Sequence, residues 1–75
     1  MDNLDFIRRV KRHHEGEWMA HEAVTAVGIG LDDRGQPALI ISVTHLDPAV
    51  RHAFPEEVET VPVILRVSGQ IDAGG

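Results

Sequence analysis

The chain has 75 residues, of which 43% are apolar, enough for one hydrophobic core and too few for a second domain. It contains no cysteine, which excludes disulfide bonds and thiolate metal sites. The formal net charge of −5 repels a phosphate backbone, so we expect no nucleic-acid partner. The first residues lack the pattern of a signal peptide, and no apolar run approaches the roughly 20 residues of a membrane span. We therefore expect a cytoplasmic protein with no membrane partner.

An amphipathic helix is predicted over about residues 3–20, because apolar residues recur there at helical spacing. Asp2 or Asn3 can cap its amino end, and Gly16 weakens it by about 1 kcal/mol relative to alanine. We interpret its charged side as a solvated face, with docking to an anionic partner as the alternative. The cations on that side are Arg8, Arg9, Lys11 and Arg12.

A β-hairpin is predicted next, with strands over about residues 24–31 and 38–45. Both strands alternate with period two, and the residues between them are turn formers. Gly28 and Gly30 lie inside the first strand and do not lead into a helix, unlike the glycines of a phosphate-binding loop. They indicate a bulge or a close approach of a neighbouring group.

A short helix over about residues 47–54 and a third strand over about residues 61–68 complete the predicted elements. Asp47-Pro48 is typical of an N-cap followed by proline at the first helical position. Pro62, near the start of the third strand, predicts a position that needs no ladder donor, such as a sheet edge.

These elements predict a two-layer α/β (α+β) domain of order α-β-β-α-β over residues 1–72, followed by a tail at 73–75. A right-handed crossover makes the third strand parallel to the second, and either beside it or beyond the first strand. The three-stranded sheet is therefore mixed. Side-chain alternation predicts that both helices cover one face, formed by Val27, Ile29, Leu31, Leu39, Ile41, Val43, Val61, Val63, Leu65 and Val67.

The opposite sheet face is small, flat and half apolar, and two helices cannot easily cover both faces of a sheet at this length. We predict that this second face is an interface; simple exposure to water is the alternative. The predicted interface residues are Ile40, Ser42, Ile64 and Arg66.

The helix also places His14, Glu17 and His21 on one side at one-turn spacing, with side chains that suit zinc. The same side packs on the sheet, so we favour half-buried histidines at the core margin over a metal site. We expect no cofactor. Glu56, Glu57 and Glu59, and the serines, lack the surroundings of catalytic groups, and we expect no enzyme.

Five short segments of the chain form a series: Val24–Gly30, Gly35–Val43, Phe54-Pro55, Val61-Pro62-Val63 and Gly69-Gln70-Ile71. This series resembles the small module that precedes the catalytic domain of bacterial trypsin-like serine proteases, including relatives of the plant narrow-leaf protease. The resemblance covers roughly residues 21–73. It departs at Thr60, where the family often has glycine, and the family's catalytic residues have no counterpart in this sequence.

The resemblance implies a non-catalytic accessory module. Together with the second face, it predicts an interaction or self-assembly module whose partner is another protein or a second copy of the chain, in a homo-oligomer. The alternative is a small metal- or ligand-binding protein that uses the helix histidines.

Overall fold

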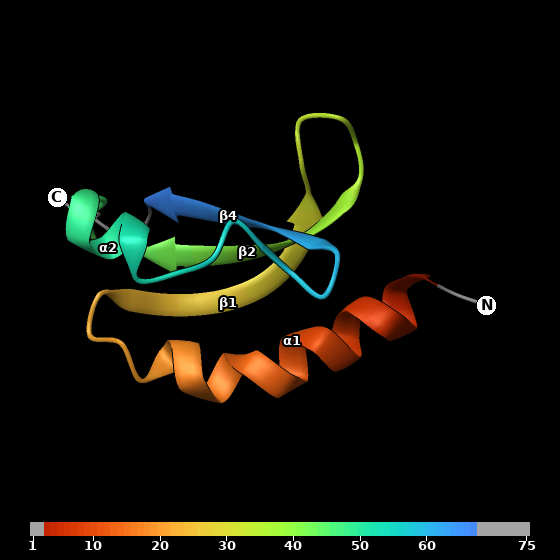
Figure 1. The fold of residues 1–75 in the computed structure, drawn as a ribbon, viewed down its shortest axis with the longest axis horizontal. Coiled ribbons are helices and arrows are strands. Elements are labelled where there is room, and N and C mark those ends of the chain that lie inside the picture. The colour runs from red at the N-terminus through yellow and green to blue at the C-terminus, as the bar shows by residue number, and fades with distance from the viewer. Residues whose placement is uncertain (1–2, 68–75) are drawn as a thin grey trace, which may run out of the picture.

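The computed structural model describes residues 3–67 of the chain (Figure 1). Within this range it contains two helices and four strands. In chain order these are α1 (Asn3–Met19), β1 (Val24–Leu31), β2 (Pro37–Val43), α2 (Pro48–His52), β3 (Glu57–Val58) and β4 (Val61–Val67). The predicted tail at 73–75, and Ser68 at the end of the predicted third strand, lie outside the described residues.

The strands form a mixed sheet in the order β1-β2-β4-β3. β1 is antiparallel to β2, β2 is parallel to β4, and β3 is antiparallel to β4. The α/β class and the parallel crossover are confirmed, and of the two predicted places the last long strand takes the one beside β2. The prediction of three strands is wrong, because the two-residue strand β3 precedes β4 and pairs with its first residues. Pro62 accordingly pairs with Glu57 of β3 and does not lie at the edge of the sheet.

The core lies between the helices and one face of the sheet. β2 is the central strand of this core, and its Leu39, Ile41 and Val43 are fully buried. Side chains of both helices belong to the same cluster, including Trp18 of α1 and Val50 of α2. Both helices therefore pack on one face, as the alternation predicts. The expectation fails at two strand ends, where Leu31 is 63% and Val67 is 51% exposed; Leu31 lies where the β1–β2 hairpin bends away from α1 (Figure 1).

The second sheet face is less open than the sequence suggests. The tip of the β1–β2 hairpin bends away from α1 (Figure 1), and its turn residues Asp32 and Arg34 line a hollow together with Ile64. Ile40 lies over Gly30, where an added Cβ would be only 2.9 Å from its Cγ1. Only 8% of Ile40 is exposed, so this face buries one of its isoleucines without a second layer.

A two-residue turn joins β3 to β4. Its residues, Glu59 and Thr60, both have positive φ, at 51° and 69°, a conformation usual for asparagine and glycine in such turns. Thr60 is β-branched and is strained there. The Thr60 hydroxyl donates to the Glu59 carbonyl, and the Glu59 carboxylate lies 3.1 Å from His14 Nε2. These contacts hold the turn although its residue types do not favour it.

Candidate functional site

The structure brings the four predicted interface residues together on β2 and β4. Ile40 pairs with Ile64, and Ser42 pairs with Arg66. Arg66 is exposed and Ile64 is half-buried, whereas Ile40 is buried. Ile40 therefore packs within the isolated chain and presents little surface there, and its place in an interface stays a prediction.

The outer edge of β4 is free over its second half. β3 pairs only with Val61 and Pro62, and the last bond along this edge runs from the Val63 amide to the Glu56 carbonyl at 3.0 Å. Because backbone groups alternate along a strand, the amide and carbonyl of Leu65 and of Val67 point the same way as those of Val63. Within residues 3–67, no strand pairs with this part of the edge.

A hollow of about 440 Å³ lies beside the free part of the β4 edge. Phe54 and Pro55 provide apolar surface in its wall. Arg51 and His52, the last two residues of α2, contribute a guanidinium group and an imidazole ring. Arg51 forms no ion pair with any of the residues described, and neither does Arg66 on β4. The complete lining is Arg51, His52, Phe54, Pro55, Glu56, Val63, Ile64 and Leu65.

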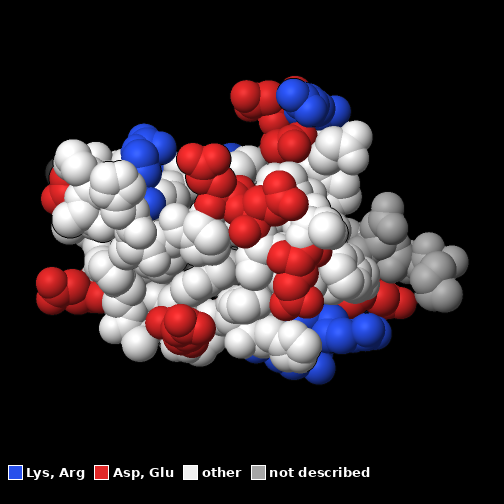
Figure 2. All heavy atoms as spheres, in the orientation of Figure 1, with Lys and Arg blue, Asp and Glu red and all other residues white. Residues whose placement is uncertain are grey.

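The opposite edge of the sheet, β1, has α1 beside it (Figure 1). Charged side chains of α1 line a hollow with Ile29 of β1, among them Lys11 and Glu15, whose charged groups are 2.8 Å apart. In Figure 2 cationic side chains lie over α1, and others lie at the β1–β2 hairpin and beside α2 and the end of β4, while acidic side chains lie across the middle of the same view. Arg8, Arg9 and Arg12 are exposed, in keeping with the predicted solvated face. The β1 edge thus has the charged side of α1 beside it.

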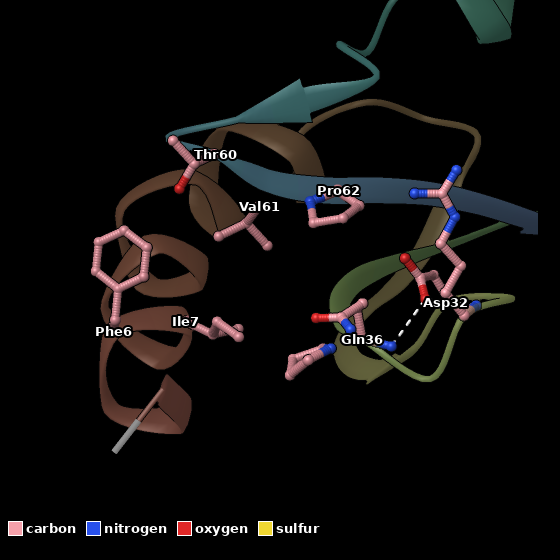
Figure 3. A pocket seen from close by; sticks show the side chains of 9 residues that line it. Phe6, Ile7, Asp32, Gln36, Thr60, Val61 and Pro62 are labelled. Atoms are coloured by element: carbon pink, nitrogen blue, oxygen red, sulfur yellow. Dashed lines mark hydrogen bonds between the residues drawn. The ribbon is translucent and has the colours of Figure 1, made fainter. Parts of the chain in front are cut away.

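Another hollow, of about 350 Å³, lies where α1, the β1–β2 turn and the β3–β4 turn meet (Figure 3). Phe6 and Ile7 face it from the helix, and Val61 and Pro62 face it from β4. Asp32 is occupied in holding the hairpin turn, since its Oδ1 accepts from the amides of Arg34 and Gln36 at 2.8 Å each. Three separate segments form this hollow, so no sequence motif marks it.

The three predicted metal ligands line one hollow, and the two histidines are engaged in other contacts. The His14 ring stacks on Trp18 with centroids 5.2 Å apart, and His21 Nδ1 accepts from the Ala23 amide at 3.1 Å. Glu17 lines the same hollow and is exposed. In the described part of the chain no group of three ligating side chains is placed to hold a metal ion. His14 and His21 are half-buried at the core margin, as the favoured interpretation expects.

Comparisons of the chain with protein-family models, with curated proteins and with solved structures find no match. Among residues 3–67 no helix is long and apolar enough to cross a membrane. The chain's own geometry is therefore the basis for assigning a function.

Proposed function

We propose that this chain is a non-catalytic protein-interaction module that receives an extended segment along the outer edge of β4. The observation that carries the proposal is the shortness of β3. This strand covers two residues of β4 and leaves the outward backbone groups of Leu65 and Val67 without a strand partner in the described range. An unpaired strand edge is a template for a further strand, which gains main-chain hydrogen bonds on docking.

The surroundings of the edge suit this role. In strand addition the main-chain bonds supply affinity, and pockets for alternate side chains supply specificity. The hollow beside Phe54 and Pro55 can take one side chain of an added strand, and Arg66 presents a charge to its neighbour. A domain of this size is only modestly stable, so it also gains stability from a bound partner.

Two sequence features support the same proposal. The predicted interface included Ile64 and Arg66, which lie on β4 on either side of the outward-facing Leu65. The resemblance to the accessory module of trypsin-like proteases also implies binding without catalysis, and a role beside such a protease belongs to this proposal.

The test removes one outward amide. Val67→Pro deletes a donor that faces away from β2, and proline is tolerated at strand edges. Val67→Thr is the matched control because it keeps the amide. The probe is the capped peptide acetyl-Thr-Val-Ser-Val-Thr-amide, followed by amide chemical shifts in NMR spectra. We expect the peptide to shift the amide resonances of positions 65 and 67 in the native chain and in Val67→Thr. In folded Val67→Pro it should cause no amide shifts. Shifts confined to another surface, or equal binding by all three proteins, would contradict the proposal.

A further inference from the structure

The geometry of the free edge also indicates what the added segment contains, an inference that depends on the proposed strand addition. Leu65 and Val67 both present their backbone groups outward, and Arg66 lies between them. A strand that bonds to both therefore places one residue directly opposite Arg66, whether it runs parallel or antiparallel to β4. The side chain of that residue lies on the same sheet face as the Arg66 side chain, because paired residues share a face.

A second copy of the chain fits this register poorly. Two β4 strands related by a two-fold axis satisfy Leu65 and Val67 of both copies only when the axis passes beside Arg66. The two guanidinium groups then stand directly opposite each other, and like charges in that position are destabilising. Arg51 of each copy would add further positive charge near the same interface.

The charges near the edge favour an acidic neighbour. Arg66 and Arg51 have no ion-pair partner within residues 3–67, and Glu56 is the one carboxylate among the side chains that line the hollow. These two arginines without an ion-pair partner in the described range occur in a chain whose net charge is −5. A carboxylate opposite Arg66 would complete a cross-strand ion pair.

In the added segment, the side chains of the two residues next to that carboxylate residue point to the helix-covered face of the sheet. They lie opposite Leu65 and Val67, which alternate with Arg66, and on that side Phe54 and Pro55 line the hollow. Val67 is half exposed and would be covered by an apolar neighbour. We infer that the occupant of the β4 edge is an extended segment of a different protein, with an acidic residue between two apolar residues and the acid opposite Arg66.

The test compares two capped peptides that differ only at the centre, acetyl-Thr-Val-Glu-Val-Thr-amide and its lysine counterpart. We expect the native chain to bind the glutamate peptide about fivefold more tightly than the lysine peptide. Arg66→Glu should reverse this preference, and Arg66→Gln should remove most of it. Because Arg66 is exposed, both variants should keep the native amide spectrum elsewhere.

The outcomes separate the two proposals. Equal affinity for both peptides, with binding still lost in Val67→Pro, would overturn the acidic partner and retain the strand addition. A dimer in light scattering that Val67→Pro dissociates would show that a second copy occupies the edge, and would likewise overturn this inference alone. Failure of both peptides to perturb Leu65 and Val67 at any concentration would overturn strand addition itself.

Discussion

Replacing Thr60 by glycine should stabilise the protein. Thr60 has a φ of 69°, and an L-residue in this left-handed region costs about 1–2 kcal/mol, with a β-branched residue at the upper end. Glycine relieves that strain but loses roughly 0.5–1 kcal/mol through the greater freedom of the unfolded chain. The net gain is about 1 kcal/mol, which raises the Tm of a domain this small by about 4–8 °C. Urea unfolding followed by circular dichroism measures the difference.

Two controls separate strain from other effects of this change. Thr60→Ala also loses the hydroxyl that donates to Glu59, but it keeps a Cβ, so the difference between the glycine and alanine variants reports the strain. Thr25→Gly makes the same change within β1, and there it should destabilise by about 1 kcal/mol. If Thr60→Gly were no more stable than Thr60→Ala, the turn would not be strained and the reasoning about the β3–β4 connection would fail.

Two further stability predictions follow from packing and capping. Gly30→Ala should cost about 1–3 kcal/mol, because its Cβ would lie 2.9 Å from Ile40 Cγ1 and force that side chain to move. Gly28→Ala is the control, since no atom lies within 4 Å of its added Cβ, and an equal loss in both variants would refute the packing argument. Asp47→Ala should cost about 1 kcal/mol in urea unfolding, because the Asp47 carboxylate accepts from the Val50 amide at 2.9 Å; an unchanged midpoint would show that this cap contributes nothing.

Local signals in the sequence account for the elements that were predicted correctly. The N-cap at Asp47, the proline after it and the period-two alternation in β1 and β2 each depend on neighbours along the chain. The same alternation identifies the helix-covered face, where Leu39, Ile41 and Val43 of β2 join the core cluster that includes residues of both helices.

The features that define the candidate site depend on contacts between distant segments. β3 escaped prediction because it has two residues and its turn, Glu59-Thr60, lacks the usual turn formers. The free edge of β4 follows from the length of β3, so it could not be predicted either. Burial of Ile40 depends on its contact with Gly30 across the hairpin, and the hollow beside Phe6 requires three segments to meet. The sequence predicted Arg66 as an interface residue, which stays a prediction, while its position between two outward-facing residues required the strand order.

Amide hydrogen exchange of β4 tests the central claim most directly. In the isolated chain, Ile64 and Arg66 should exchange slowly because their amides face β2, whereas Leu65 and Val67 should exchange rapidly at the free edge. Adding the glutamate peptide should slow Leu65 and Val67 and leave Ile64 unchanged. Slow exchange of Leu65 and Val67 without any partner would show that the edge is already paired, and would contradict its role as a docking site.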